Sequence, residues 1–252
     1  MAETFNVVIP ARYRSTRLPG KPLADIHGEP MIVRVAQRAA RAGAQRVIVA
    51  TDDERVCQAV TDAGYVAMMT RADHRSGSDR VMEVAASCGW RDDSIVINVQ
   101  GDEPLIPPAV IRQVANCLTA DPELTAATLC EPMDDQQSVS DPNVVKVVRG
   151  RDGQALYFSR APVPYDRDGD AVARADTWLR HVGIYGYRLA TLRRFVELPP
   201  SRLESVERLE QLRLLENGIR LYVADACETV PAGVDTPEDL ERVRLHVQRM
   251  DE

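Results

Sequence analysis

The sequence contains few cysteines, few aromatic residues and no long hydrophobic run. Its five cysteines are odd in number and form no CxxC pair, which argues against a disulfide framework or a zinc site and favours reduced thiols in the core. No apolar stretch is long enough to span a bilayer, and the N-terminus lacks the charged start and apolar segment of a secretion signal. We therefore expect a soluble, cytoplasmic protein with no membrane partner.

The chain also lacks an excess of positive charge. Its 252 residues carry a formal net charge of -7, and the sequence pI is about 5.3. A protein that holds a nucleic acid by bulk electrostatics usually presents a basic face, so we expect no nucleic-acid partner, and any phosphate site must be local. With 44% hydrophobic and 27% charged residues, the length suits one large α/β domain or two small ones.

The first half of the sequence alternates strand-like runs of Val and Ile with amphipathic helical segments. This is the pattern of a parallel sheet with crossover helices. The predicted strands are Phe5 to Ile9, Val47 to Ala50, Tyr65 to Met69 and Ser94 to Gln100. The predicted helices run from Glu29 to Gly43, from Thr51 or Asp52 to Gly64, and from Ser76 or Ser78 through Ala85.

The second half has fewer helical segments, and its region from about residue 125 to 190 is rich in predicted strands. These strands are Thr125 to Cys130, Val144 to Val148, Ala155 to Ser159 and His181 to Tyr187. An exposed loop from Val163 to Asp176 could close over a ligand. A charged helix is predicted from Ser201 to Asn217, a strand from Ile219 to Ala224 and a last helix from Thr236 to Met250. No repeat or linker interrupts the chain, so residues 1–252 are predicted to form one domain.

A cluster of basic residues follows the first predicted strand. This loop carries Arg12, Arg14, Arg17 and Lys21, and it lies where open α/β sheets bind ligands, at the carboxyl ends of strands. The sequence has neither a GxxxxGK[ST] nor a GxGxxG motif, so the cations themselves would hold phosphate oxygens. The residues alone leave a solvated basic loop as an equal alternative.

Two acidic residues from distant parts of the chain are candidate metal ligands. Asp102 follows a buried strand, and Asp235 precedes Thr236 and Pro237 at a predicted helix start. Mg²⁺ prefers oxygen ligands and keeps several waters, so one or two carboxylates suffice to hold it. On the residues alone, Asp102 is more typical of the start of a turn, and Asp235 of an ordinary helix cap.

Several segments together resemble a known family. The phrase from Pro10 to Pro22, PARYRSTRLPGKP, closely resembles the nucleotide-binding loop of sugar nucleotidyltransferases, and specifically of the 3-deoxy-manno-octulosonate cytidylyltransferases. Further matching phrases lie in the family's order at Thr70 to Arg80, Val99 to Pro104, Tyr157 to Arg160, Arg180 to Arg188, Leu209 to Arg213 and Gly233 to Leu240. The basic loop alone would indicate only a nucleotidyltransferase, whereas the ordered set is specific.

The resemblance implies a fold and a reaction. The fold would be a single α/β domain with a mostly parallel, mixed central sheet flanked by helices, a Rossmann-like nucleotidyltransferase fold. A β-rich insertion would serve sugar binding and dimerisation, and the protein would be a homodimer. The reaction would transfer CMP from CTP to the anomeric hydroxyl of 3-deoxy-D-manno-octulosonate (Kdo) with Mg²⁺ as cofactor, releasing pyrophosphate and supplying lipopolysaccharide biosynthesis.

The resemblance also assigns residues, carried over position by position. The triphosphate would be bound by Arg12, Arg17 and Lys21, and the cytidine pocket would be lined by Ser76, Gly77 and Arg80. Magnesium would be held by Asp102 and Asp235. The sugar would be surrounded by Gln100, Arg160, Arg167, His181, Glu210 and Gln211, with Arg160 as the partner of its carboxylate. Catalysis would rest on Lys21, Asp102, Asp235 and Arg12, which align the substrates and neutralise charge.

Other interpretations remain open at this point. His181 taken alone is more typical of a structural histidine, and Glu210 and Gln211 of a solvated helix face. The nearest rival activity is a cytidylyltransferase for sialic acid or an amino-substituted Kdo analogue. A nucleotide-sensing protein without turnover would not need both Asp102 and Asp235. A glycosyltransferase of this fold usually has a DxD signature, which Asp102-Glu103-Pro104 lacks.

Overall fold

The central sheet is built around β1 (Phe5–Ala11), which pairs in parallel with β4 (Arg46–Thr51) on one side and with β6 (Ile95–Asn98) on the other. A fourth parallel strand, β5 (Val66–Met69), continues the sheet beyond β4. These parallel pairings confirm the sheet that was predicted for the first half of the sequence. The computed structural model describes residues 4–133, 135–168 and 177–251 of the chain.

The rest of the sheet is antiparallel around one long strand, β10 (Trp178–Arg188). This strand pairs with β6 and with β7 (Ala126–Met133), and β11 (Tyr222–Asp225) pairs in parallel with β7. A hairpin of β8 (Lys146–Arg149) and β9 (Ala155–Ser159) adds to the end of β10. The sheet is thus mixed, with the order β11-β7-β10-β6-β1-β4-β5.

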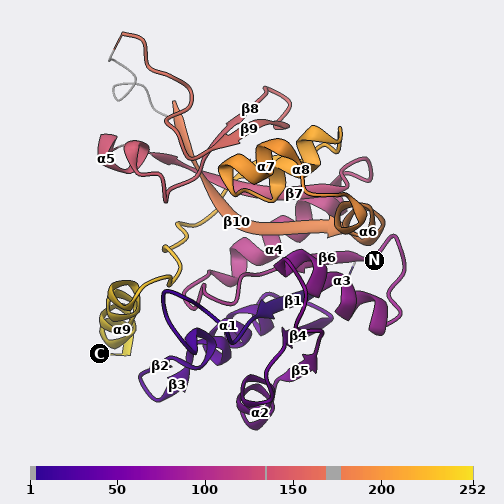
Figure 1. Cartoon of the computed structure of the whole chain (residues 1–252), viewed down its shortest axis with the longest axis vertical. Helices are drawn as coiled ribbons and strands as arrows, with labels where there is room; N and C mark the ends of the chain where they lie inside the picture. Colours follow the sequence, from indigo (N-terminus) through magenta and orange to yellow (C-terminus); the bar gives the residue numbers. More distant parts are fainter. Residues whose placement is uncertain (1–3, 134, 169–176, 252) are drawn as a thin grey trace.

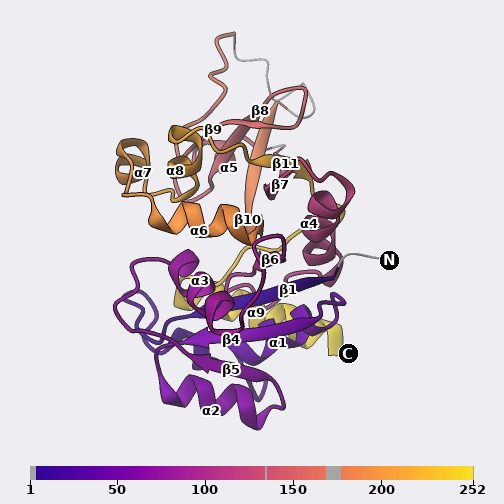
Figure 2. The ribbon, with the colours of Figure 1, turned by 90° about the vertical axis from the view of Figure 1, so that its right-hand side faces the viewer.

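Helices cover both faces of the sheet, as Figure 2 shows. One face packs against α1 (Met31–Ala40), α2 (Glu54–Asp62) and α4 (Pro108–Ala120), and the other against α3 (Gly77–Ser87), α6 (Leu189–Glu197) and α8 (Gln211–Glu216). Because side chains alternate along β1, Val7 and Ile9 belong to the buried cluster on the face of α1, α2 and α4, and Val8 belongs to the cluster on the opposite face. No described helix has both the length and the apolar composition of a membrane span.

The last helix returns to the N-terminal half of the molecule. In Figure 1, α9 (Pro237–Asp251) lies beside the small hairpin of β2 (Asp25–Ile26) and β3 (Glu29–Pro30), away from the other C-terminal helices. Val234, Leu240 and Val243 of this segment share a buried cluster with Ile26 and Met31. This packing places the start of α9 beside the loop that follows β1.

The structure differs from the sequence-based expectation in several elements. The helix predicted from Ser201 to Asn217 is two helices, α7 (Arg202–Glu207) and α8, separated by a turn at Arg208. The helices α4, α5 (Gln136–Ser140) and α6 and the single turn η1 (Lys21–Leu23) were not predicted. The loop expected from Val163 to Asp176 lies partly on residues 169–176, outside the described residues.

Candidate active site

Three segments meet at the carboxyl edge of the parallel strands: the loop after β1, the loop after β6 and the start of α9. Two glycines permit the approach. A Cβ on Gly101 would lie 2.7 Å from the Pro10 carbonyl oxygen, and one on Gly233 would lie 3.1 Å from the Asp102 carbonyl oxygen. The backbone N–H of Val234 donates to that same Asp102 oxygen at 2.8 Å. The contact fixes Asp235 beside Asp102.

Lys21 links the two acids. Its Nζ donates to Asp102 Oδ2 at 2.6 Å and to Asp235 Oδ1 at 2.9 Å, and Arg17 Nη2 lies 3.0 Å from the same Asp235 oxygen. Burial acts to lower the pKa of Lys21, but the Asp102 charge and the hydrogen bonds to both carboxylates outweigh it and raise that pKa above 10.5. The ammonium therefore stays charged between the two carboxylates.

The helix cap at α9 is made by Thr236 and not by Asp235. Thr236 Oγ1 accepts from the N–H of Asp239 at 3.2 Å, while the Asp239 carboxylate accepts from the N–H groups of Asp235 and Thr236 at 3.0 Å each. This reciprocal arrangement satisfies the start of the helix. The Asp235 carboxylate is left to face Lys21, so Asp235 is not the helix cap, and its role as a metal ligand stays a prediction.

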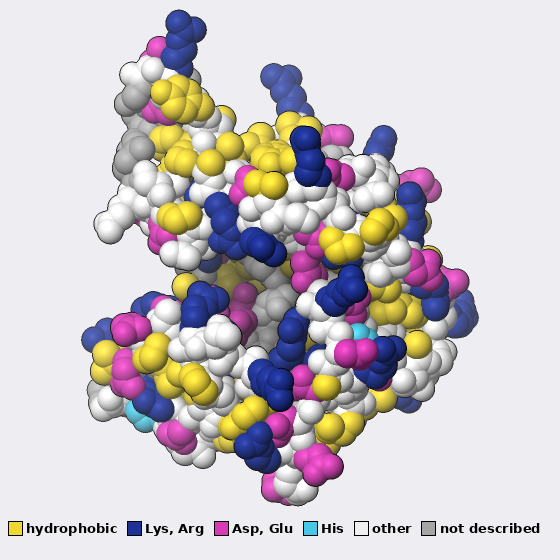
Figure 3. All heavy atoms as spheres, viewed as in Figure 1, with side chains coloured by type: hydrophobic (Ala, Val, Ile, Leu, Met, Phe, Trp, Pro, Cys, Tyr) yellow, Lys and Arg dark blue, Asp and Glu magenta, His cyan; other side chains and the backbone are white. Residues whose placement is uncertain are grey.

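A cleft of about 480 Å³ opens at this meeting point. Its lining includes five cations and two carboxylates, which are Arg12, Arg14, Arg17, Lys21, Arg80, Asp102 and Asp235. Figure 3 shows the molecule hollowed on this face, with basic and acidic side chains gathered around the hollow. We call this the main cleft. Its excess of positive charge suits a polyanionic ligand.

Two of the predicted base-pocket residues, Gly77 and Arg80, line the main cleft from α3, and Ser76 lines a neighbouring hollow at the start of that helix. Ser76 caps the helix by accepting from the N–H of Asp79 at 3.2 Å, and Gly77 lies against Pro10. The side chain of Arg80 is wholly buried, and burial lowers its pKa. Its Nη2 donates to Asp52 Oδ2 at 3.2 Å. These residues present an N-terminal helix turn and a buried guanidinium to a ligand.

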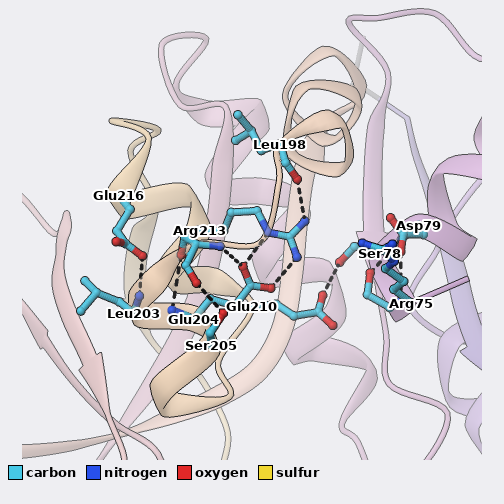
Figure 4. Close-up of polar contacts among 12 residues, drawn as sticks. Arg75, Ser78, Asp79, Leu198, Leu203, Glu204, Ser205, Glu210, Arg213 and Glu216 are labelled. Carbon is cyan, nitrogen blue, oxygen red and sulfur yellow. Dashed lines mark hydrogen bonds and ion pairs between the residues drawn. The ribbon is translucent and has the colours of Figure 1, made fainter.

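A smaller hollow of about 170 Å³ adjoins the main cleft, and we call it the side pocket. Gln100 and Gly77 line both. Glu210 and Gln211, at the start of α8, line the side pocket together with Tyr185 and Tyr187 of β10. Glu210 Oε2 accepts from Ser78 Oγ at 3.3 Å (Figure 4), and burial raises the pKa of this carboxyl. Glu210 and Gln211 are thus pocket residues and not a solvated helix face.

His181 does not line the side pocket, but its ring centroid lies 5.4 Å from that of Tyr185, which does. It is buried, and burial lowers its pKa to about 3, so it is neutral at ordinary pH. Thr128 Oγ1 lies 2.9 Å from Nε2 and already donates its one proton toward the carbonyl oxygens of Ile184 and Val182. Nε2 must therefore carry the hydrogen, which leaves Nδ1 as an acceptor.

The two arginines assigned to the sugar lie apart from these hollows. Arg160 donates from Nε to the Glu207 carbonyl oxygen at 2.8 Å and from Nη1 to the Pro142 carbonyl oxygen at 2.8 Å. It lines neither the main cleft nor the side pocket, and nor does the exposed Arg167. Their assignment to the sugar stays a prediction.

Sequence reasoning missed two contributors to the site. Asp52 joins the basic loop to Arg80, because its Oδ1 accepts from the N–H of Tyr13 at 3.2 Å while its Oδ2 accepts from Arg80. The sequence does contain a signal for Asp52, because an acidic residue directly after a parallel strand lies at the edge of the sheet where ligands bind. Arg208 lines the side pocket from the turn between α7 and α8. Nothing local in the sequence marks that turn.

The donor set at the main cleft suits a hard divalent cation. Asp102 and Asp235 offer carboxylate oxygens that already converge on one positive charge, the Lys21 ammonium. Within the described residues, no group of three or more His, Cys, Asp or Glu side chains is placed to hold a metal. A cation here would therefore share its coordination among these two acids, waters and the ligand.

Known proteins resemble this chain over nearly its whole length. The model of the Cytidylyltransferase family matches residues 6–221. A 3-deoxy-manno-octulosonate cytidylyltransferase from Alcanivorax borkumensis is 54% identical over 248 residues, which cover 97% of this chain and 98% of the relative.

Solved structures agree with the sequence comparison. A CMP:2-keto-3-deoxy-manno-octonic acid synthetase complexed with CTP has a TM-score of 0.91 and 46% identity, and the match covers 98% of this chain and 100% of that chain. A cytidylyltransferase from Leptospira borgpetersenii shares the fold, with a TM-score of 0.64, 15% identity and coverage of 98% of this chain and 87% of that one.

Proposed function

Because this chain belongs to the cytidylyltransferase family, we propose that it transfers CMP from CTP to the anomeric hydroxyl of Kdo, an acidic eight-carbon sugar, and releases pyrophosphate. The relative from Alcanivorax borkumensis is named for this activity, and the related synthetase was solved with CTP. The observation that carries the proposal is the convergence of Lys21, Asp102 and Asp235 in a cleft with an excess of positive charge.

Mg²⁺ is the proposed cofactor, held by Asp102 and Asp235. Two carboxylates that meet at one cationic group support this, since Mg²⁺ takes oxygen ligands and is commonly shared between one or two acids and substrate phosphates. Held by Asp102 and Asp235, the ion would supply positive charge that neutralises the charge developing in the reaction. The chain then has to place the two substrates around it.

The reaction needs no protein nucleophile. The anomeric oxygen forms a bond to the α-phosphorus, the bond from that phosphorus to the bridging oxygen breaks, and the hydroxyl proton passes to water. Arg12, Arg17 and Lys21 would bind the triphosphate and stabilise the charge that grows on pyrophosphate. Lys21, which joins the two acids here, is within reach of both the acids and a phosphate chain in the main cleft.

The remaining residues would hold the base and the sugar. Ser76, Gly77 and Arg80 line or border the main cleft on the α3 side and would contact cytidine. Gln100, Glu210 and Gln211 line the side pocket and would bind sugar hydroxyls, with His181 supplying an acceptor at Nδ1. Because Gln100 lines both hollows, the sugar and the α-phosphate would meet beside it.

We also propose that the protein is a cytoplasmic homodimer that supplies an activated sugar to lipopolysaccharide biosynthesis. The predicted dimerisation region carries two exposed apolar side chains, Leu156 and Tyr165, that such an interface would cover. Sedimentation or light scattering would report the oligomeric state. A monomer at micromolar concentration would contradict this part of the proposal.

Pyrophosphate release tests the activity. The purified protein is mixed with CTP, Kdo and Mg²⁺, and the assay is repeated with UTP or ATP and with sialic acid or an amino-substituted Kdo analogue. CTP and Kdo are expected to give the fastest release. A preference for sialic acid or for the amino-substituted analogue would assign the neighbouring activity, and CTP binding without release would leave a nucleotide sensor.

A further inference from the structure

The turn between α7 and α8 holds Arg208 in a left-handed backbone conformation, with φ 57°. This conformation is unfavourable for a non-glycine residue, because it brings the Cβ atom too close to the following carbonyl oxygen. Such residues persist where the surrounding structure enforces them, and they concentrate at ligand-binding sites. Among the described residues, only His27 shares this feature with Arg208 outside glycine.

A buried ion pair enforces the turn. Arg213 of α8 donates to both carboxylate oxygens of Glu204 in α7, and the two side chains are 9% and 11% exposed (Figure 4). The carbonyl oxygen of Glu204 also accepts from the N–H of Arg208 at 2.8 Å and from that of Leu209 at 3.4 Å. Glu204 therefore holds both ends of the turn and fixes the position of Arg208.

The Arg208 side chain is exposed where two hollows meet. It lines the side pocket, and it also lines a neighbouring hollow of about 360 Å³ between α3 and α7. In the part of the chain that the structure describes, Arg208 is the one cation that lines the side pocket. Its guanidinium forms no hydrogen bond or ion pair with any described residue, in contrast to Arg213 and Arg160.

We propose that Arg208, and not Arg160 as the resemblance implies, binds the carboxylate of the sugar acid in the side pocket and selects for an acidic sugar over a neutral one, because Arg208 lines this pocket and Arg160 does not. The inference rests on the proposed function and assigns a further contact within it. A guanidinium matches a carboxylate with two parallel hydrogen bonds, and Glu210, which lines the same pocket, suits hydroxyl groups. The Glu204–Arg213 pair fixes the backbone of the turn from which the Arg208 side chain lines the side pocket.

Three variants separate the charge from the backbone. Arg208→Gly removes the guanidinium and is relaxed in the left-handed conformation, Arg208→Ala removes it and keeps the strain, and Arg208→Lys keeps the charge without the planar fork. Arg202→Ala is the matched control, because Arg202 is an exposed cation of α7 that lines none of the described hollows.

Steady-state kinetics and Kdo calorimetry measure the effect. In Arg208→Gly, the KM for Kdo should rise about ten- to a hundredfold, as expected for losing a charged hydrogen-bonded contact, while the KM for CTP stays within about twofold. Its melting temperature should equal or exceed that of the wild type. Arg208→Lys should recover part of the affinity, and Arg202→Ala should match the wild type.

The outcomes distinguish this inference from the proposed function. An unchanged Kdo affinity in Arg208→Gly would overturn the inference while leaving the activity in place. Equal losses for both substrates together with a lower melting temperature would show a structural role and would also overturn it. If the wild type released no pyrophosphate, the proposed function would fail. Calorimetry with Kdo, which needs no turnover, would still compare Arg208→Gly with the wild type.

Discussion

Asp102 and Asp235 accept hydrogen bonds from one nitrogen, Lys21 Nζ, at 2.6 and 2.9 Å. Two carboxylates this close to one point repel each other unless positive charge lies between them. Lys21 provides that charge, and Arg17 adds a second cation at 3.0 Å from Asp235. The chain thus assembles from distant segments a site that is already arranged for positive charge and lies beside a cationic cleft.

Asp52 should be needed for CTP binding although it lines neither the main cleft nor the side pocket. Its two oxygens accept from the N–H of Tyr13 and from Arg80, and an amide has one acceptor oxygen. Asp52→Asn must therefore turn its NH₂ toward one of these donors. We expect the KM for CTP to rise about tenfold, with the KM for Kdo unchanged, in steady-state kinetics.

The neighbouring acid is a matched control for that variant. Asp53 caps α2 by accepting from the N–H of Arg55 at 3.0 Å. Asp53→Asn keeps a capping side chain and removes the same charge, so its KM for CTP should equal that of the wild type. Equal KM values for Asp52→Asn and Asp53→Asn would show that Asp52 does not position the nucleotide site.

His181 should make stability depend on pH. Its pKa is about 3 in the folded protein against 6.5 for an ordinary histidine, so the unfolded chain takes up the proton first as pH falls. The stabilisation is fully present above pH 6.5 and is lost progressively as the pH falls toward 3. At pH 5 the loss relative to neutral pH amounts to about 2 kcal/mol.

His181→Gln removes this contribution. Thermal or denaturant unfolding between pH 7 and pH 4 should show a shallower loss of stability in the variant than in the wild type, because the carboxylate titrations are common to both. Parallel curves would show that His181 is not buried as a neutral imidazole. Ring ¹⁵N shifts of the wild type should report a hydrogen on Nε2, as the contact with Thr128 requires.

The Glu204–Arg213 pair should stabilise the fold as a unit. Removing one partner of a buried pair leaves an unpaired charge, so Glu204→Met is expected to lower the free energy of unfolding by about 3–5 kcal/mol. Adding Arg213→Met removes the second charge and should restore part of that loss. Denaturant unfolding of the four proteins in a double-mutant cycle measures the coupling, and strictly additive losses would contradict it.

The sheet could be predicted from the sequence because its strands are marked locally. Runs of Val and Ile covered on both faces identify β1 and β6 to within a few residues. The helix α4 was missed although Pro107 and Pro108 mark its start and Val110, Ile111 and Val114 recur at helical spacing. The break at Arg208 had no such local signal, since a tertiary ion pair imposes it.

The site was predictable in composition but not in geometry. The residues alone left Asp102 as a turn and Asp235 as a cap, and the resemblance to a family was needed to bring them together. Their proximity depends on the bond from Val234 to the Asp102 carbonyl oxygen and on the packing of α9 against the N-terminal half, neither of which has a local sequence signal.

The most direct test of the paired acids is the rate of pyrophosphate release from CTP and Kdo in Asp102→Asn and in Asp235→Asn. Each amide keeps the shape of the side chain and removes one charge from the point where Lys21 now binds, so each turnover number should fall by at least about 10²-fold. Asp93→Asn, at an exposed acid paired with Arg91, should keep the wild-type rate. Near-normal turnover in either of the first two variants would contradict the account.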